Sequence, residues 1–211
     1  MATLPRLAPL AAAATDVRCL ARRRGVRAAL ETVVRGVADG YAREELHVLV
    51  KRLDDIPPVA GEPRLELSDL GPESLPELAA LNRARCDTRA DHRFAGNLQR
   101  QYHGFIAHEN GTLVGYYWWL DAAADHDHLA QLGLELGPGD VYGFDFFLGE
   151  AHRGQGRAIE FLYGVETRLR ERGFERLWGY VTQSNTPARW LYATRGYEVT
   201  ETLTRRRAAM R

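Results

Sequence analysis

The 211-residue sequence has few cysteines, no excess of charge and almost no lysine. Its two cysteines, Cys19 and Cys86, form no Cys-x-x-Cys pair, so the pattern favours neither a disulfide framework nor a zinc site. We therefore expect two unpaired thiols in a reducing compartment and a cytoplasmic protein. Lys51 stands alone among 28 basic residues, which we attribute to coding bias rather than to function.

The charge balance and the hydropathy of the sequence limit the kinds of binding partner that we expect. The 28 basic and 28 acidic residues cancel, so nothing in the overall charge attracts nucleic acid or an anionic membrane. No apolar stretch reaches the roughly 18 residues that a membrane span needs. Arg6 and the apolar residues 7–14 resemble a signal peptide, but the run is short and alanine-rich, and we expect a frayed terminus.

Residues 1–61 differ in character from the remainder and are predicted to form an N-terminal extension. Apolar positions 26, 29, 30, 33, 34 and 37 fit one face of an amphipathic helix over 26–38. A short strand over 46–50 and a Pro-rich linker over 57–63 follow. We expect the helix to cover the main domain. Homodimer formation and contact with a membrane surface are the alternatives, and no part of the extension is expected in the ligand site.

Residues 62–211 read as one α/β (α+β) domain in which helix and strand patterns intermingle. Strands are predicted at 65–67, 105–108, 113–120, 141–148, 177–181 and 197–204, and helices at 71–81, within 83–103, at 154–172 and at 187–194. Asn110-Gly111 provides the positive φ angles of a tight hairpin turn. The polar insertion 121–140 contains His126 and His128 without a third ligand at a clear spacing, which predicts a solvated loop and no metal.

The segment Arg153-Gly154-Gln155-Gly156-Arg157-Ala158 joins an apolar strand to an amphipathic helix. Glycine lets the backbone turn sharply and point successive N–H groups at a ligand. The helix that follows adds unpaired N–H groups and the positive end of its dipole, so the segment predicts a pyrophosphate site. It is neither a Walker loop nor a dinucleotide fingerprint, because Gly-Lys-Ser/Thr and the GxGxxG spacing are both missing.

A second motif follows downstream, where Asn185, Ala188 and Tyr192 share one helical face by their i, i+3, i+7 spacing. Together the two motifs resemble those of the GNAT superfamily. Its motif A, Arg/Gln-x-x-Gly-x-Gly/Ala, is matched by Arg153, Gly156 and Ala158. Its motif B, Asn-x-x-Ala-x-x-x-Tyr-x-x-x-Gly-Phe/Tyr, is matched from Asn185 to Tyr197. The resemblance covers 141–205, extends back to 64 and does not reach the first 60 residues. Where many members have Pro-Glu-Tyr before motif A, this chain has Glu150-Ala151-His152.

The resemblance implies a mixed, mostly antiparallel sheet whose two central parallel strands splay apart, with acetyl-CoA as cosubstrate. The motif A amides would hold the pyrophosphate, strand 146–148 would pair with the pantetheine amides, and Asn185 would bind the pantetheine arm or cap the last helix. Tyr192 would face the thioester sulfur as the acid. The implied cofactor-binding residues are Phe146, Phe147, Leu148, Arg153, Gly154, Gln155, Gly156, Arg157, Ala158 and Asn185.

Two further features come from the residues themselves. Asp145 interrupts the apolar strand 141–148, and a carboxylate in such a strand is rare without a reason, so we interpret it as a site residue. In GNAT enzymes an acid on this strand is often the base or the group that holds a water molecule; Glu150 and His152 are the next candidates for the base. In the aromatic run 116–119, alternation sends two rings to each face, one pair to the core and the other toward the acceptor pocket.

The predicted function is transfer of an acetyl or other short acyl group from acyl-CoA to a primary amine, by direct attack in a ternary complex. The expected acceptor is a small molecule, with no nucleic acid as partner. One alternative is a non-catalytic acyl-CoA-binding regulatory module, which would have no need of an acid at Tyr192. Another is an acyltransferase that uses a longer acyl-CoA or an acyl carrier protein, which the bulky Phe144, Phe146 and Phe147 disfavour.

Overall fold

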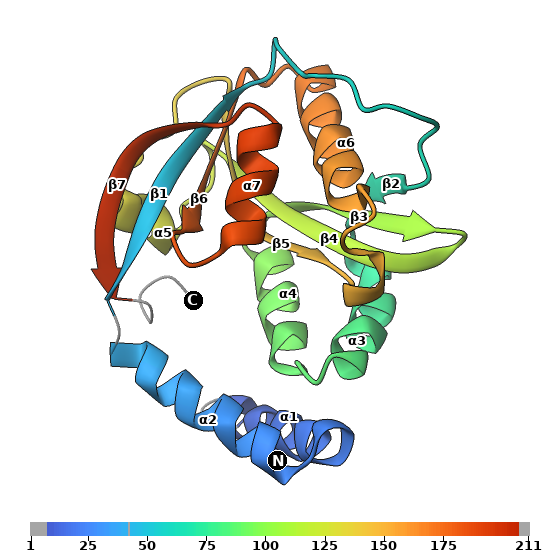
Figure 1. Cartoon of the computed structure of the whole chain (residues 1–211). Coiled ribbons are helices and arrows are strands. Elements are labelled where there is room, and N and C mark those ends of the chain that lie inside the picture. Colours follow the sequence, from blue (N-terminus) through green and yellow to red (C-terminus); the bar gives the residue numbers. More distant parts are fainter. Residues whose placement is uncertain (1–7, 42, 207–211) are drawn as a thin grey trace. The chain divides into compact units, whose positions relative to one another are not determined.

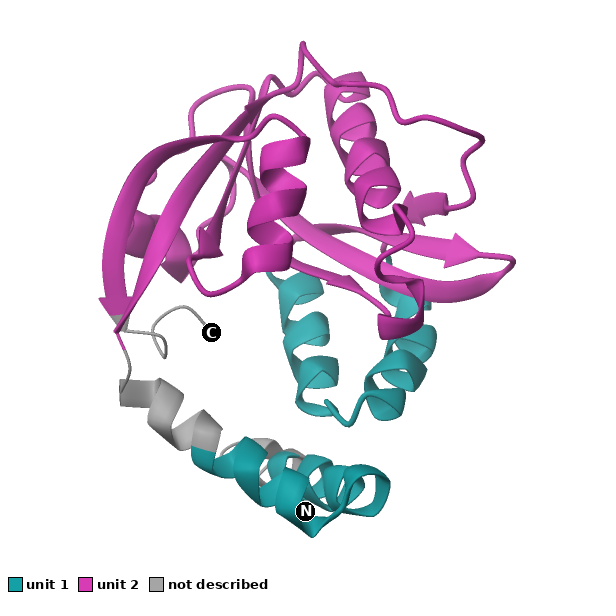
Figure 2. Ribbon diagram, in the orientation of Figure 1, with its two compact units in different colours: residues 1–42, 71–100 teal, residues 43–70, 101–211 magenta. Residues whose placement is uncertain are grey.

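A computed structural model describes residues 8–41 and 43–206, which form two compact units (Figure 2). Of the described residues, the first unit combines 8–41 with 71–100, and the second combines 43–70 with 101–206. This division differs from the expected boundary at residue 61, because strand 43–52 belongs with the sheet and segment 71–100 belongs with the N-terminal helices. Among the described residues, no helix is long and apolar enough to span a membrane.

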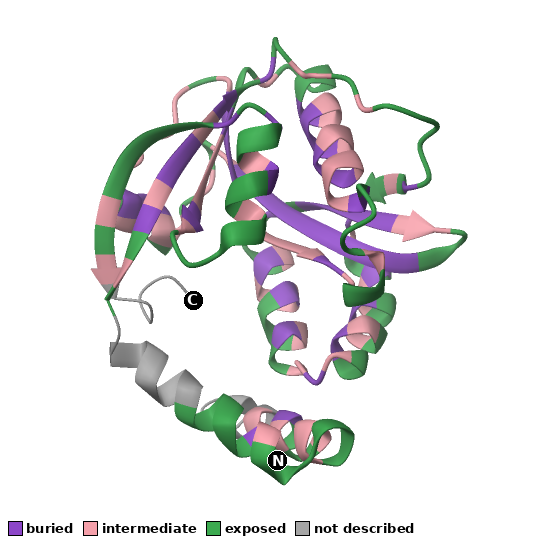
Figure 3. Ribbon diagram, viewed as in Figure 1, coloured by how far each residue is buried: buried purple, intermediate pink, exposed green. Residues whose placement is uncertain are grey.

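The first unit is helical, and its helices begin and end as follows: α1 (Ala8–Arg24), α2 (Val26–Tyr41), the short η1 (Pro72–Ser74), α3 (Leu75–Ala84) and α4 (Arg89–Gln99). The helix predicted at 26–38 is confirmed as α2, whose Val26 and Leu30 are exposed. Exposed residues make up most of the described part of this helix (Figure 3). The frayed terminus predicted before it is wrong from residue 8 onward, because α1 occupies that segment.

The prediction of two unpaired thiols is also wrong. Cys19 on α1 and Cys86 after α3 form a disulfide, with their Cα atoms 5.6 Å apart. The side chain of Asp16 holds the same two segments together, because its Oδ1 accepts hydrogen bonds from the backbone N–H and the hydroxyl of Thr88. The pairing spans 67 residues of sequence, and no short-range spacing signals such a contact.

The second unit is built on a seven-stranded mixed sheet with the order β2-β3-β4-β5-β6-β1-β7 (Figure 1). The strands are β1 (Arg43–Arg52), β2 (Glu66–Asp69), β3 (His103–Glu109), β4 (Thr112–Asp121), β5 (Asp140–Leu148), β6 (Arg176–Thr182) and β7 (Glu198–Arg206). Among the strands that the structure describes, only β5 and β6 run parallel to each other, and they lie inside the sheet. Asn110 and Gly111 both have positive φ, which confirms the predicted hairpin turn between β3 and β4.

The strand predicted at 46–50 lies inside this sheet rather than in a separate extension. As β1 it pairs with β6 on one side and with β7 on the other, so that Leu46 lies between Thr182 and Leu203. Leu46, Val48 and Leu49 are all buried, which fits a strand that is covered on both faces. The resemblance that ended at residue 64 therefore missed one strand of the fold.

The helices of this unit are α5 (Asp127–Leu132), the short η2 (Glu150–His152), α6 (Arg157–Glu171) and α7 (Thr186–Thr194). Phe161, Val165 and Leu169 on α6 and Leu191 on α7 bury their side chains in one core with the sheet. The rings of Tyr117 and Trp119 on β4 join the same core, as alternation along the strand predicts for one pair of the aromatic run.

A buried ion pair joins α6 to the end of α7, and its arginine also contacts the segment that follows β1. Glu166 on α6 accepts a hydrogen bond from the guanidinium of Arg195, which also donates to the carbonyl of Pro57, 2.7 Å away. Burial raises the pKa of Glu166, and the charges of Arg195 and Lys51 oppose that shift. The only lysine of the chain thus lies buried on β1, beside the carboxylate that it helps to keep charged. Losing one member of such a group would leave an uncompensated charge in the core.

Candidate active site

The candidate site begins where the two parallel strands separate. The described pairing of β5 with β6 runs from Asp140–Arg176 to Tyr142–Trp178 and stops there. Gly143 comes next on β5, and a Cβ atom at this position would lie 1.7 Å from the hydroxyl oxygen of Tyr117. A cavity of about 220 Å³ opens beyond this point, lined by Tyr117, Gly143, Phe144, Asp145, Phe146, Tyr180, Val181, Thr182, Asn185, Ala188 and Tyr192. The splay that the resemblance implied is therefore present.

A bulge in β5 sets the direction of Asp145. Its φ is +49°, and the register of β5 against β4 shifts between Tyr116 and Trp118, so that Asp145 and Phe146 together lie opposite one residue of β4. Such a bulge re-aims side chains. The hydroxyl of Tyr116 lies 3.4 Å from Asp145 Oδ1. The bulge was not foreseen, because aspartate only occasionally adopts this backbone conformation and nothing in the local sequence requires it.

Tyr192 and Asn185 reach the cavity from α7. Asn185 caps the helix, since its side-chain oxygen accepts a hydrogen bond from the backbone N–H of Ala188, 3.3 Å away. The ring of Tyr192 packs 4.9 Å from that of Tyr197. Burial raises the pKa of Tyr192 above its ordinary value, and Tyr180 and Glu166 add to the shift. The phenol therefore remains protonated at neutral pH and can act as a hydrogen-bond donor.

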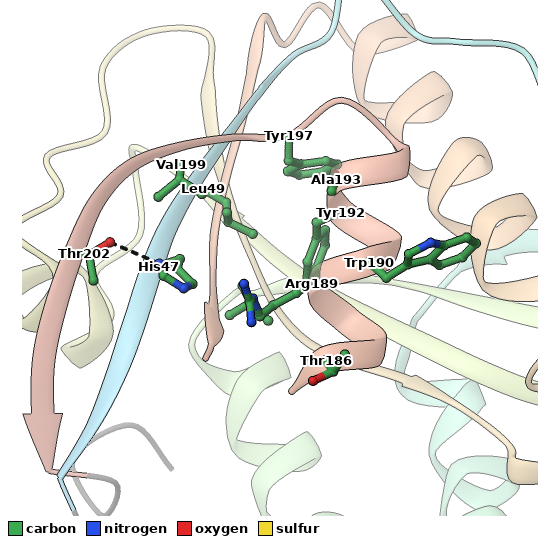
Figure 4. Close-up of a pocket in the computed structure, with 11 residues that line it drawn as sticks. His47, Leu49, Thr186, Arg189, Trp190, Tyr192, Ala193, Tyr197, Val199 and Thr202 are labelled. Carbon is green, nitrogen blue, oxygen red and sulfur yellow. Dashed lines mark hydrogen bonds between the residues drawn. The ribbon is translucent and has the colours of Figure 1, made fainter. Parts of the chain in front are cut away.

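A second cavity of about 470 Å³ lies between α7 and strands β1 and β7 (Figure 4). His47 on β1 and Thr202 on β7 form its far wall and are linked by a 3.0 Å contact between His47 Nδ1 and the threonine hydroxyl. Arg189 extends from α7 toward them (Figure 4). Val181 and Tyr192 line both cavities, so the Tyr192 ring forms part of the boundary between the two spaces.

The glycine-rich loop has the backbone form expected of an anion site. Gly154 and Gly156 have φ angles of +76° and +77°, and a Cβ atom built on either would meet nothing within 4 Å. Gly156 is the N-cap of α6, whose first turn leaves backbone N–H groups without partners in the helix. The loop is therefore open on the side from which a phosphate could approach.

The two arginine side chains of this loop lie against the protein. Arg157 is buried and its Nε donates to Glu109 Oε1 at 2.7 Å, while His152 Nδ1 lies 2.6 Å from the other carboxylate oxygen. Arg153 donates to the carbonyl of Leu148 at 2.9 Å, with its guanidinium over the Phe147 ring. The hydrogen bonds from Arg157 and His152 lower the pKa of Glu109. Because both guanidinium groups are bonded to the protein in this way, an anion would be bound by the backbone N–H groups of the loop.

The remaining candidate residues lie near the same strand and loop. Phe147 and Leu148 pair with Tyr116 and Gly115 of β4 through one edge of β5. Leu148 is buried, Phe146 and Phe147 are half-buried, and Ala158 packs against the core from α6. Gln155 is exposed in the glycine-rich loop.

The polar insertion differs from the expected solvated loop. His126 and His128 are half-buried, and their rings lie 5.9 and 6.4 Å from that of Tyr142. His128 Nδ1 is 3.2 Å from the Tyr142 hydroxyl, and His126 accepts a hydrogen bond from the backbone of His128. Nothing in the described part of the chain groups three or more His, Cys, Asp or Glu side chains as a metal site would require.

Burial lowers the pKa of His128 from 6.5 to about 4, and the neighbouring His126 adds to the shift. The unfolded chain takes up this proton at its ordinary pKa, so the free energy of unfolding should fall as pH drops from 6.5 to about 4. We expect His128→Asn, which keeps a neutral hydrogen-bonding group, to lose less stability over this window. Urea unfolding at pH 7, 5.5 and 4.5 measures the difference, and identical losses in both proteins would contradict the assignment.

The comparisons with known proteins agree with this geometry. A model of the acetyltransferase (GNAT) family matches residues 72–197, more than half of the chain. A search of curated protein sequences found no match. Solved structures that resemble this one include a GNAT-family acetyltransferase from Colwellia psychrerythraea, at TM-score 0.57 and 11% identity over 96% of this chain and 74% of that one.

Two further structures show the same fold. One is a GCN5-related N-acetyltransferase from Sphaerobacter thermophilus, at TM-score 0.52 and 19% identity over 86% of this chain and 56% of that one. The other is a conserved protein of unknown function from Staphylococcus epidermidis, at TM-score 0.56 and 11% identity over 82% of this chain and 64% of that one. This chain thus spans less than two thirds of either protein. The family match and the splayed sheet together show that the chain belongs to the acetyltransferase (GNAT) family.

Proposed function

We propose that this protein transfers an acetyl group from acetyl-CoA to a primary amine. The observation that carries the proposal is the cavity between β5 and β6, because it is lined by side chains from both faces of the sheet. Val181 belongs to the core beneath α6 and α7, whereas alternation along β6 directs Tyr180 to the opposite face. A thioester held at one face and an amine at the other would therefore meet in this opening.

The residues present fit acetyl-CoA. The open backbone of Gly154 and Gly156 at the start of α6 would hold the pyrophosphate, and the edge of β5 that faces β6 beyond Tyr142 would receive the pantetheine arm as an added strand. Bound there, acetyl-CoA supplies an activated acyl carbon and a thiolate leaving group. Asp145 is assigned as the base that takes a proton from the acceptor ammonium, directly or through water.

Tyr192 is assigned to the leaving sulfur. A thiol has an ordinary pKa of about 8.5, below that of a phenol, so complete transfer of the phenolic proton to the thiolate is uphill. The raised pKa of Tyr192 strengthens this preference. We therefore infer that Tyr192 stabilises the departing sulfur by donating a hydrogen bond, with proton transfer completed from solvent.

Incubation with acetyl-CoA and a pooled library of amines, read by mass spectrometry, tests the activity. New products heavier by one acetyl group, with stoichiometric release of free CoA, are expected. If CoA binds while no amine in the pool is acetylated, the protein acts as a non-catalytic acyl-CoA-binding module instead. If longer acyl-CoA donors react faster than acetyl-CoA, the assignment of a short acyl group is wrong.

Gly156→Val is expected to weaken CoA binding by at least about tenfold, since it places a branched side chain where the pyrophosphate would approach. The positive φ of this position also strains any L-residue. Gly173→Val is the matched control, because Gly173 at the other end of α6 has a φ of +87° and open space around its Cβ position. Thermal shift with CoA should be lost in the first variant and kept in the second. Equal shifts in both would remove the loop from the site.

A further inference from the structure

The face of the sheet opposite α6 and α7 carries a cluster of rings at the same opening. Val141, Leu177 and Val181 point into the core beneath the two helices, so their neighbours along β5 and β6 point to the other face. We call the rings gathered there the aromatic wall: Tyr102, His126, Tyr142, Phe144 and Tyr180. Phe144 and Tyr180 also line the cavity between β5 and β6, so the wall reaches the candidate reaction site.

Phe144 is the centre of the aromatic wall. Its ring centroid lies 4.7 Å from that of His126, 5.6 Å from that of Tyr102 and 5.9 Å from that of Tyr142. The contact with Tyr102 is edge to face and the contact with Tyr142 is stacked, which are the arrangements that aromatic pairs prefer. The ring of a ligand could therefore pack on the aromatic wall through the same kinds of contact.

The rings behind Phe144 are held in place. The Tyr102 hydroxyl donates to the carbonyl of Asp125 at 2.5 Å, and the Tyr142 hydroxyl lies 3.2 Å from His128 Nδ1. Tyr102 and Tyr142 are fully buried, whereas Phe144, His126 and Tyr180 are half-buried and so present surface to a ligand. The polar insertion thus holds the rings behind Phe144 in place. A surface that is already ordered loses less conformational entropy when it binds a rigid partner.

Two carboxylates lie near the aromatic wall. Asp145 follows Phe144 directly on β5, and Glu44 lies on β1, the strand that pairs with β6. The pKa of Tyr180 is raised to about 12, first by burial and then by the charges of Asp145 and Glu44. The lowered pKa of His128 keeps this ring neutral at pH 7. A cation is therefore favoured at this end of the cavity, both by the carboxylates and by the ring faces.

We propose that the acceptor is a primary ammonium carried on a flat aromatic body, whose ring packs on Phe144 and Tyr180 while Asp145 holds the ammonium. This inference rests on the proposed function. The ammonium gives one proton to Asp145, and its nitrogen then forms the new C–N bond as the C–S bond breaks and CoA leaves as its thiolate. The nitrogen loses its second proton to water, which leaves a neutral amide. Planarity matters because a thin ring fits against the ring faces of the aromatic wall, whereas a puckered ring of the same size does not.

The test compares three probe amines at saturating acetyl-CoA: 2-phenylethylamine, 2-cyclohexylethylamine and n-butylamine. The first two share charge and linker and differ in the planarity of the ring. Release of CoA measures kcat/KM for each. We expect 2-phenylethylamine to exceed 2-cyclohexylethylamine by about tenfold, the size of one or two ring–ring contacts.

Phe144→Leu should reduce the preference for 2-phenylethylamine over 2-cyclohexylethylamine to about threefold or less. The matched control is Phe174→Leu, which removes a half-buried ring that packs edge to face on Trp119, outside the cavity, and should leave the preference intact.

The outcomes separate this inference from the proposed function. If the pooled library yields acetylated products but the aromatic and cyclohexyl amines react equally, the protein is an acetyltransferase and the aromatic acceptor is wrong. The same conclusion follows if Phe144→Leu and Phe174→Leu lower the preference by the same factor, since the cluster would then be structural. If no amine in the library is acetylated while CoA binds, the proposed function itself fails.

Discussion

Asp145→Asn is expected to lower turnover by roughly 10²–10⁴-fold, the range that a positioned general base contributes. A primary amine with an ordinary pKa of about 10.4 is almost entirely cationic at neutral pH and must lose a proton before it can attack. Asparagine keeps the size of the side chain and tolerates the left-handed backbone of the bulge, where Asp145 has a φ of +49°. The substitution therefore removes the base while preserving the shape of β5.

The pH dependence of the rate tests whether Asp145 is the base. Without the base, the remaining rate follows the fraction of free amine, which rises as pH approaches the amine's own pKa. The deficit of Asp145→Asn relative to the wild type should therefore be largest near pH 6 and shrink toward pH 9.5, with CoA affinity unchanged. Asp127→Asn, in the first turn of α5, is the matched control. If Asp145→Asn and the wild type have parallel pH–rate profiles, the base lies elsewhere, with Glu150 the next candidate.

Tyr192→Phe is expected to lower kcat by about one to three orders of magnitude, the loss that accompanies removal of one hydrogen-bond donor from the transition state. The phenylalanine ring keeps the 4.9 Å contact with Tyr197, so only the hydroxyl is lost. Acetyl-CoA affinity should change little, because the developing charge on sulfur exists in the transition state and not in the bound thioester.

A stability measurement distinguishes this role from a structural one. Tyr163→Phe on α6 is the control, because Tyr163 packs beneath the Arg195 guanidinium and lies outside the cavity between β5 and β6. Both variants should unfold at similar temperatures, and only Tyr192→Phe should be slow in single turnover, where chemistry limits the rate. Turnover equal to the wild type in single-turnover experiments would exclude Tyr192 from the mechanism.

The structure changes what can be expected of a shortened protein. If residues 1–61 formed a separate extension outside the ligand site, as the sequence predicts, a chain that begins near residue 61 would retain that site. Such a chain would lack β1, the strand between β6 and β7, and with it Lys51 and the carbonyl of Pro57 that accepts from Arg195. We now expect that protein to lose the β6–β1–β7 half of its sheet.

Local signals in the sequence were sufficient to predict much of the secondary structure of the second unit. Apart from α5 and the short η2, the order of strands and helices from residue 103 onward follows from hydrophobic period and turn residues, and Asn110-Gly111 has the backbone that its hairpin requires. The sequence also predicted the positions of Gly154 and Gly156 at the start of α6 and of Asn185 at the cap of α7. Each of these features depends on residues a few positions apart, which is the range over which sequence patterns carry structural information.

The features that join segments far apart in the sequence depend on the tertiary structure. The disulfide between Cys19 and Cys86, the place of β1 between β6 and β7, and the ion pair of Arg157 with Glu109 all bridge long stretches of chain. The bulge at Asp145 depends on how β5 registers against β4, and the aromatic wall depends on an insertion folding back onto β5. The sequence alone determined the family and the glycine-rich loop at the start of α6, because both depend on short motifs. The shape and charge of the proposed acceptor side arose only when packing brought separate strands together.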